Sequence, residues 1–387
     1  MDHTSITTSP TFCPAPWTSL NIDQAGHVSP CFHCVEMVGN NKTETIQEII
    51  HGPILTSMRE SMARGEWHSG CSWCKRLEET TGASGRTVRV VSEETASAIN
   101  NKSDFFALQH LVINWSNLCN LACVYCNDET STAWQSINKI PINHVKNEHQ
   151  DLIALAKEQG HNIQGLSLGG GEPLLQKGLD DFLNYLDTAK VRVMVTTNLS
   201  IDITTNPIYN KLKTWPQVDW MISFDNANKE KFEYVRHGAK WNQFVKNIQQ
   251  MKSDNQQVIA HPAYSIYCAC DLLEYYDFCA KENLNIFWCE LTHPWELDIR
   301  RHSLAVRQRA IEEIDRTVAK YCNYPNLGTD VLKRYRLTLE DPSYIENKNF
   351  DPQNIVKWTA DIEHKLHKTQ KFQDLWPELA RMIDVNS

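Results

Sequence analysis

Three cysteines with the spacing C-x3-C-x2-C follow directly after an apolar run. They are Cys119, Cys123 and Cys126, and the run before them covers residues 111–115. Cysteine thiolates are the ligands that hold iron–sulfur clusters, and three of them leave one iron of a four-iron cubane open to a ligand from outside the protein. A zinc site normally needs a fourth ligand at a characteristic spacing, which the adjacent residues do not supply. The segment therefore predicts an iron–sulfur cluster with an open, reactive iron.

After these cysteines, apolar strand-like runs alternate with helical patterns. The expected strands cover residues 109–115, 164–168, 191–196, 218–224, 258–266 and 285–291. The expected helices include residues 145–158, 177–187, 241–252, 306–320 and 372–383. Such alternation predicts an α/β fold with a parallel sheet and helical crossovers. Six strand–helix units are fewer than the eight of a closed barrel, so the pattern favours an open, partial (β/α)6 barrel.

Glycine-rich or polar segments follow three of the expected strands. They are Gly169-Gly170-Gly171-Glu172-Pro173, Thr196-Thr197-Asn198 and Ser223-Phe224-Asp225. Parallel strands gather their carboxyl ends at one edge of the sheet, where α/β proteins bind ligands. The segments therefore predict one ligand site at that edge.

The cysteine spacing, followed by these segments, resembles the radical S-adenosylmethionine (radical SAM) superfamily. The resemblance implies that Cys119, Cys123 and Cys126 hold a 4Fe–4S cluster whose open iron binds SAM. It also implies reductive cleavage of SAM to methionine and a 5′-deoxyadenosyl radical, which abstracts a hydrogen atom from the substrate. An electron donor such as flavodoxin or ferredoxin would then be a partner.

The resemblance also assigns cofactor contacts to the strand ends. The backbone of Gly170 and Gly171 and the carboxylate of Glu172 would bind the ammonium group of SAM, through charge-assisted hydrogen bonds to the carboxylate. The other candidates for cofactor contacts are Tyr125, Thr197, Asn198, Ser223 and Asp225. Two of them have a second interpretation, because the Tyr125 ring could simply cover the cluster and Asp225 could buttress its loop. Arg236 could orient an anionic group of substrate or cofactor, or be an ordinary surface arginine.

A second group of cysteines precedes the expected barrel. Cys13, Gly26 and Cys31 stand as C-x12-G-x4-C, and Cys71 and Cys74 form a C-x2-C pair. This spacing resembles the SPASM/twitch domains, which begin with a hairpin whose turn glycine precedes the second cysteine. The resemblance implies that these four cysteines hold a second, auxiliary 4Fe–4S cluster, and the single group favours the one-cluster twitch type. Cys34 is a fifth candidate, and a zinc ribbon built from Cys31, Cys34, Cys71 and Cys74 is the alternative.

We expect three domains from this organisation. Residues 1–103 would form the twitch-like auxiliary-cluster domain, residues 104–300 the radical SAM partial barrel, and residues 301–387 a C-terminal helical extension.

Composition limits the classes of partner. The formal charge of −9 argues against broad binding to nucleic acid or to an anionic membrane surface. The sequence shows neither a signal peptide nor an apolar stretch of the ~20 residues that span a membrane, so we expect a cytoplasmic protein.

The resemblance favours a peptide or small-molecule substrate and an oxidative modification aided by the auxiliary cluster. One alternative is a radical SAM enzyme that modifies RNA or transfers methyl groups and carries a structural zinc module; another is a non-catalytic iron–sulfur electron-transfer protein. No acid or base can be singled out, and the catalytic residue stays unknown among the candidates His261, Glu290 and Asp298.

Overall fold

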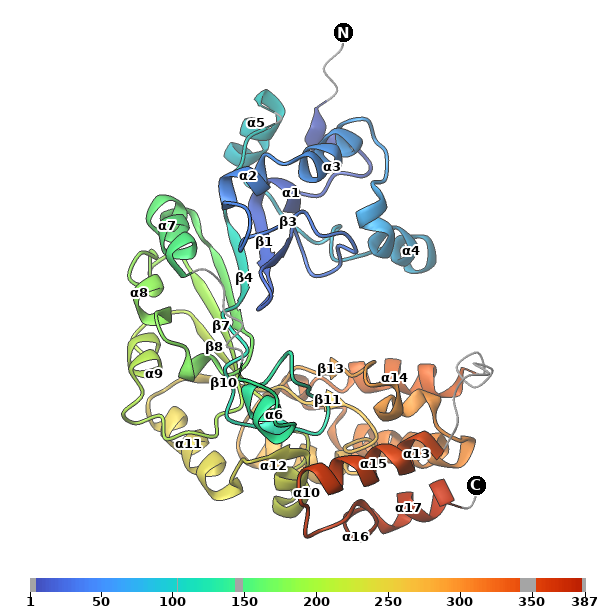
Figure 1. Cartoon of the computed structure of the whole chain (residues 1–387). Coiled ribbons are helices and arrows are strands. Elements are labelled where there is room, and N and C mark those ends of the chain that lie inside the picture. Colours follow the sequence, from blue (N-terminus) through green and yellow to red (C-terminus); the bar gives the residue numbers. More distant parts are fainter. Residues whose placement is uncertain (1–4, 103, 143–148, 342–352, 385–387) are drawn as a thin grey trace. The chain divides into compact units, whose positions relative to one another are not determined.

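The computed structural model describes residues 5–102, 104–142, 149–341 and 353–384. By the contacts between its residues, the chain forms two units, whose elements are labelled in Figure 1. The first unit comprises Met1–Leu118, His144–Val195 and Thr214–Val218. The second comprises Cys119–Asn143, Thr196–Lys213 and Asp219–Ser387. The expected division at residues 103 and 300 stays a prediction.

A largely parallel sheet forms the core of the first unit. Strands β4 (His110–Asn114), β6 (Gly165–Gly169) and β7 (Arg192–Thr197) run parallel, with Leu111 opposite Leu166. Alternate residues of β4 and β6 are buried, as expected for strands with one face on the core. Helices α7 (His149–Gln159) and α8 (Leu179–Leu183) lie in the crossovers, which confirms the βα alternation that the sequence predicts (Figure 1).

The N-terminal segment extends this sheet, which the sequence analysis did not predict. Strand β1 (Ser19–Ile22) pairs parallel to β4, and β2 (His27–Ser29) and β3 (Gly39–Asn40) follow antiparallel. Gly26 lies in the turn between β1 and β2 with φ +86°, a conformation that favours glycine. The hairpin with a turn glycine is therefore present as the resemblance implied. The helices of this segment are α1 (Ala15–Thr18), α2 (Ile46–Ile50), α3 (Pro53–Ala63), α4 (Ser72–Thr81) and α5 (Glu93–Asn101).

The second unit contains three further parallel strands and two short strand pairs. Strands β8 (Val218–Ile222), β10 (Gln257–Ala260) and β12 (Asn285–Ile286) run parallel. Every residue of β8 is buried, as expected for a strand covered on both faces. The parallel strands of the two units confirm the predicted α/β class, with a sheet consistent with a partial barrel. The short strands pair as β5 (Ala122–Cys123) with β9 (Arg236–His237), and β11 (Ala263–Tyr264) with β13 (Cys289–Glu290).

Two expected strands are interrupted. Residues 258–266 form β10 and β11, separated at Pro262, which has no N–H to donate to a strand ladder. Directly after it, the N–H of Ala263 donates to the carboxylate of Asp225 (2.9 Å). Residues 285–291 are interrupted at the same level, as β12 and β13.

The expected helices are mostly confirmed. Helix α11 (Trp241–Ser253) buries Phe244, Ile248 and Met251, one side of a 3.6-residue period. The helix expected over residues 177–187 is shorter in the structure, where α8 covers only five residues. It begins after Gly178, whose φ of +82° is not helical. The expected helix over residues 372–383 is broken at Pro377 into α16 (Phe372–Leu375) and α17 (Pro377–Asp384). Residues 145–148 of the first expected helix lie outside the described residues.

The C-terminal extension is part of the second unit and packs on its other helices. Helix α13 (Leu304–Tyr321) contacts α12 (Leu272–Lys281) and α14 (Asp330–Glu340), and α15 (Gln353–Lys365) follows (Figure 1). The indole of Trp376 donates to Asp271 (2.9 Å), and the hydroxyl of Tyr234 donates to Glu363 on α15 (3.2 Å). The remaining helices of this unit are α6 (Thr132–Ile137), α9 (Pro207–Leu212) and α10 (Lys229–Val235). Within the described residues, no helix is long and apolar enough to cross a membrane.

Candidate iron–sulfur and cofactor sites

Hydrogen bonds hold the loop that carries Cys119, Cys123 and Cys126. The N–H of Cys126 donates to the carbonyl of Cys123 (3.0 Å), which closes the last turn of the loop. The hydroxyl of Thr132, in the first turn of α6, donates to the carbonyl of Cys119 (3.1 Å). The indole of Trp134 donates to the carbonyl of Cys123 (2.9 Å). The following helix α6 therefore fixes the backbone of Cys119 and Cys123.

The three thiols lie close enough to act on one another. A hydrogen bond between Cys123 and Cys126 raises the pKa of the Cys123 thiol and lowers the pKa of the Cys126 thiol. The charge of Cys119 also acts on Cys126. Asn198 Nδ2 lies 3.7 Å from Cys119 Sγ. In the described parts of the chain, no three His, Cys, Asp or Glu side chains are arranged to hold a single metal ion. Thiolates that bind separate irons of a cluster need not converge on one atom, so this thiol set fits a cluster.

Asp225 lies at the end of β8 and is 1% exposed. Its Oδ2 accepts from the hydroxyl of Tyr125 (3.1 Å) and from Arg236 Nε (3.0 Å), and its Oδ1 accepts from the N–H of Ala263 (2.9 Å). The guanidinium of Arg236 also lies over the Tyr125 ring, 5.6 Å from its centroid. Burial acts to lower the pKa of Arg236, but the charges of Asp225, Tyr125 and Cys123 and the hydrogen bond to Asp225 together outweigh it, so the pKa is raised. These contacts match the buttressing interpretation of Asp225, and Arg236 is a buried residue.

The loop after β7 is tied to the cysteine loop. Asn198 donates from Nδ2 to Asn120 Oδ1 (3.3 Å), and Asn120 donates to the hydroxyl of Ser200 (2.8 Å). The hydroxyl of Thr197 accepts from the N–H of Leu199 (3.0 Å), so it shapes the turn. Asn198 therefore lies beside Cys119, one of the predicted cluster ligands, together with Asn120, which the sequence analysis missed.

The strand end after β8 is connected to the same loop. The N–H of Ser223 donates to the carbonyl of Thr197 (2.8 Å), and the Ser223 side chain is half-buried. Asn247 of α11 donates to the carbonyls of Leu199 (2.9 Å) and Ile201 (2.6 Å). A buried amide on a helix thus fixes the backbone beside Asn198.

The GGGEP segment of the first unit lies against the residues that lead into the cysteine loop. The N–H of Gly171 donates to the carbonyl of Ser116 (2.7 Å), and the N–H of Glu172 donates to the carbonyl of Leu118 (2.8 Å). A Cβ on Gly171 would lie 2.2 Å from the Leu118 oxygen, and one on Gly170, whose φ is +92°, would lie 2.7 Å from the Ser116 oxygen. Glycine is required here because two backbones approach closely.

Glu172 is fully buried at the end of this segment. Its Oε1 accepts from the N–H of Leu174 (3.0 Å) at the start of a short 3-10 helix, Pro173–Leu175. Gln176 donates from Nε2 to the carbonyls of Leu118 (3.0 Å) and Glu172 (2.9 Å). The sequence analysis missed this glutamine, although it lies four residues after Glu172.

The three candidate acid–base residues differ in their surroundings. His261 Nδ1 lies 2.7 Å from the carbonyl of Phe287, and burial lowers the pKa of the imidazole. A neutral ring that donates from Nδ1 keeps its acceptor at Nε2. Glu290 and Asp298 both pair with Arg300, at 2.6 Å and 2.7 Å. Of the three, His261 is therefore the one that is not paired with Arg300.

The five N-terminal cysteines form a second thiol group, in the first unit. Burial raises the pKa of the thiols of Cys13 and Cys34 to about 11 and of Cys71 to about 12. The charges of the four other thiols also act on Cys71, and the charge of Cys74 acts on Cys31. Cys34 Sγ in addition lies 3.1 Å from the carbonyl of Glu36. The four predicted ligands therefore lie together, with Cys34 beside them.

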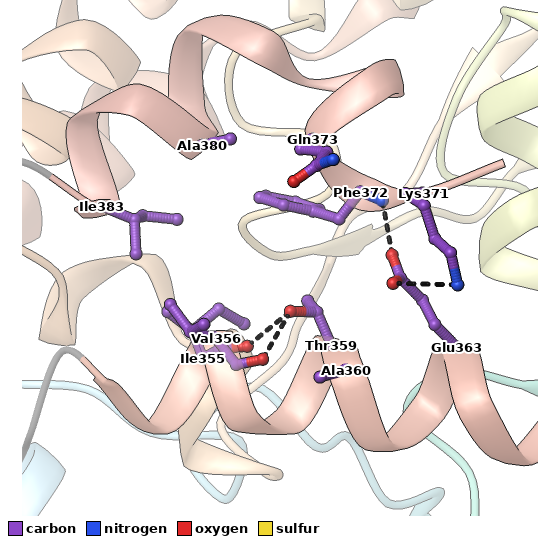
Figure 2. A pocket seen from close by; sticks show the side chains of 10 residues that line it. All are labelled: Ile355, Val356, Thr359, Ala360, Glu363, Lys371, Phe372, Gln373, Ala380 and Ile383. Atoms are coloured by element: carbon purple, nitrogen blue, oxygen red, sulfur yellow. Dashed lines mark hydrogen bonds and ion pairs between the residues drawn. The ribbon is translucent and has the colours of Figure 1, made fainter.

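A separate pocket of about 260 Å³ lies in the C-terminal extension, between α15 and the α16–α17 pair (Figure 2). Its wall is mostly apolar, with Ile355 and Phe372 on opposite sides, and Glu363 pairs with Lys371 (3.5 Å) at one end (Figure 2). None of the predicted site residues lines it.

Comparison with known proteins finds two matching regions, and each of them contains one of the two thiol groups. Residues 113–262 match the Radical SAM superfamily, and residues 13–75 match the iron–sulfur cluster-binding domain SPASM. The chain is 26% identical over 155 residues to GTP 3′,8-cyclase of Peptoclostridium acidaminophilum, which covers 38% of this chain and 43% of the relative. It is 25% identical over 172 residues to 7-carboxy-7-deazaguanine synthase of Clostridium acetobutylicum, covering 43% of this chain and 67% of the relative. The match thus spans less than half the length of that cyclase.

Solved structures show weaker similarity. The structure of Streptococcus suis SuiB bound to precursor peptide SuiA has a TM-score of 0.44 and 17% identity, covering 69% of this chain and 60% of SuiB. Native anSMEcpe with bound AdoMet has a TM-score of 0.42 and 14% identity, covering 57% of this chain and 63% of that protein.

The matched residues contain both thiol groups. The radical SAM match includes Cys119, Cys123 and Cys126, and the SPASM match includes the five N-terminal cysteines. The cofactors that go with these two matches are the 4Fe–4S cluster with SAM of the radical SAM superfamily and the auxiliary iron–sulfur of the SPASM domain. The chain therefore contains a radical SAM domain, residues 113–262, with a SPASM domain on its N-terminal side, residues 13–75.

Proposed function

We propose that this enzyme abstracts a hydrogen atom from a peptide or a small metabolite and completes an oxidative modification of it. The observation that carries the proposal is the presence of two thiol groups in one chain, one of three cysteines in a loop and one of five. When bound, the first cluster supplies the electron that cleaves SAM to a 5′-deoxyadenosyl radical, and the auxiliary cluster supplies an acceptor for an electron from the substrate.

The residues of the chain would hold and orient these groups. Cys119, Cys123 and Cys126 would bind three irons of the first cluster, and Cys13, Cys31, Cys71 and Cys74 would bind the second. Glu172, buried and already oriented by the N–H of Leu174, would bind the ammonium group of SAM. Asn198 and Ser223 would contact the rest of the cofactor.

The substrate class follows from charge and from the relatives. A net charge of −9 disfavours the broad electrostatic contact that RNA binding requires. The name of one relative, GTP 3′,8-cyclase, refers to a small metabolite. These two observations support a small molecule or a peptide over nucleic acid.

Metal analysis under anaerobic conditions tests the cluster assignment. Two 4Fe–4S clusters contain about eight irons, so the purified chain should hold about eight and a Cys119/Cys123/Cys126 triple Ala variant about four. The wild type, but not the variant, should form 5′-deoxyadenosine from SAM with a strong reductant. Cleavage retained by the triple variant would exclude the proposed radical site. About four irons with one zinc would instead make the N-terminal group structural.

A further inference from the structure

Two charged groups that act on Cys123 come from distant parts of the chain. Strand β9 pairs with β5, which places Arg236 directly opposite Cys123. Arg236 is 5% exposed and Asp225 is 1% exposed. Arg236 Nε lies 3.0 Å from Asp225 Oδ2. The charges of both residues act on Cys123, in opposite directions: Arg236 favours the thiolate and Asp225 disfavours it. A buried, paired cation and anion therefore lie beside one cluster ligand.

A second cation, in the C-terminal extension, interacts electrostatically with the same ligand. Lys368, which follows α15, donates from Nζ to the carbonyl of Tyr234 (2.7 Å) at the C-terminal end of α10. Such a position favours a cation, because the last carbonyls of a helix have no partners within it. Burial lowers the pKa of Lys368 to about 8, and the charge of Cys123 acts in the opposite direction. Lys368 thus lies near enough to Cys123 for their charges to interact.

Charge close to an iron–sulfur cluster changes its reduction potential, since reduction adds one negative charge to the site. A nearby cation stabilises the reduced cluster and raises the potential, whereas a nearby anion lowers it. The effect is strongest where the charges are buried and water does not screen them. Arg236, Asp225 and Lys368 meet this condition better than surface charges.

We propose that Arg236, Asp225 and Lys368 are positioning residues that set the reduction potential of the cluster held by Cys119, Cys123 and Cys126. The proposal rests on the cluster assignment made above, and it gives the C-terminal extension a role in the radical chemistry. Removal of Arg236 leaves Asp225 as an uncompensated buried anion, so the potential should fall. Removal of the Asp225 charge leaves Arg236 uncompensated, so the potential should rise.

The test is the midpoint potential of this cluster, measured without SAM at pH 7 by electron paramagnetic resonance in the anaerobic full-length protein. Arg236→Gln should lower the potential by at least about 59 mV, and Asp225→Asn should raise it by at least about 59 mV. For a one-electron couple, this shift is a tenfold change in the equilibrium constant of reduction. Lys368→Met should lower it. The spectrum of the Cys119/Cys123/Cys126 triple Ala variant identifies the auxiliary signal, which is subtracted.

Four controls separate charge from structure. Arg236→Lys keeps the cation and should restore most of the wild-type potential, and the Arg236→Gln/Asp225→Asn double variant should lie between the two single variants. Tyr125→Phe removes one hydrogen bond of Asp225 without changing charge, and should leave the potential near the wild-type value. Lys252→Gln is the distant control, because it removes the cation of the Lys252–Glu282 pair (3.0 Å). Lys252 lies near the end of α11 that precedes β10, and hence at the opposite edge of the parallel strands from Asp225.

The outcomes are distinguishable. Loss of the cluster signal from the wild type would overturn the cluster assignment itself. Potentials that stay within the wild-type error in both Arg236→Gln and Asp225→Asn, with the iron retained, would overturn the inference but leave the proposed function intact. Shifts of the same sign in both variants would likewise show a structural role rather than a charge effect.

Discussion

Among single residues, the candidate cofactor site contains polar groups that are buried and already oriented. Glu172 is fully buried and accepts from the N–H of Leu174, and Asn198 lies between Asn120 and Cys119. A buried carboxylate is costly to keep charged without partners, and a bound ammonium group is a suitable partner. Orientation before binding reduces the ordering cost that a ligand must overcome.

Glu172→Gln tests this carboxylate. Glutamine keeps the size and the oxygen acceptor for the N–H of Leu174 but removes the charge. We expect normal iron content and SAM affinity weakened about tenfold or more, since hydrogen bonds to charged groups contribute about 1.5–3 kcal/mol. A titration of SAM into the reconstituted protein measures this, with iron content as the check on folding. Unchanged affinity would remove Glu172 from the cofactor site.

At the scale of elements, backbone contacts position the ends of strands. The segment after β6 crosses the residues after β4 so closely that side chains are excluded at Gly170 and Gly171. This contact places Leu118, the residue immediately before Cys119, through the hydrogen bond from Glu172. The glycines therefore serve the cysteine loop as well as the strand end to which they belong.

Gly171→Ala should displace the lead into the cysteine loop. Its Cβ would lie 2.2 Å from the Leu118 oxygen, and backbone on both sides limits relaxation. We expect loss of about half the iron, that of the SAM-binding cluster, in the anaerobically purified variant. The matched control is Gly85→Ala, whose Cβ would meet only the His33 side chain, at 3.6 Å. Equal iron content in the two variants would contradict the positioning role.

At the scale of the whole molecule, the two thiol groups belong to different units. The five N-terminal cysteines lie in the first unit, and Cys119, Cys123 and Cys126 lie in the second. Each group is held by contacts within its own unit, such as those of α6 with the cysteine loop. We therefore expect each cluster to form without the other.

Cys71→Ala tests this independence. The pKa of Cys71 responds to all four other N-terminal thiols, so its removal should disrupt the auxiliary site. We expect iron to fall from about eight to about four while reductive cleavage of SAM stays within about twofold of the wild type. Loss of cleavage together with the auxiliary iron would show instead that the two sites depend on each other.

The stability of the second unit should depend on pH through His302. This imidazole is 3% exposed, contacts the carbonyl of Glu296 (2.8 Å), and burial lowers its pKa to about 4. Between about pH 6.5 and 4 the unfolded chain binds a proton that the folded chain does not, so stability falls as the pH falls through this window. The loss should approach about 3 kcal/mol at pH 4.

Urea unfolding at pH 7 and pH 5 measures this effect. His302→Gln keeps a donor for the Glu296 carbonyl but does not titrate, so its unfolding midpoint should change less between the two pH values. Equal changes in wild type and variant would assign the pH dependence to other groups.

The features that depend on neighbouring residues could be predicted from the sequence alone. The spacing of Cys119, Cys123 and Cys126, the glycines before Glu172 and the apolar periods of the strands are local patterns, and each thiolate or glycine has a limited range of uses. They were enough to predict the parallel α/β fold and the two thiol groups.

The partners of the buried charges and the position of the N-terminal strands could be read only from the three-dimensional structure. Asp225 binds Tyr125, Arg236 and Ala263, and Lys368 reaches the end of α10 from 134 residues away. Strand β1 pairs parallel to β4, a segment far from it in the sequence, so its place in the sheet depends on that pairing. Such contacts depend on strand register and helix packing, so they leave no pattern in adjacent residues.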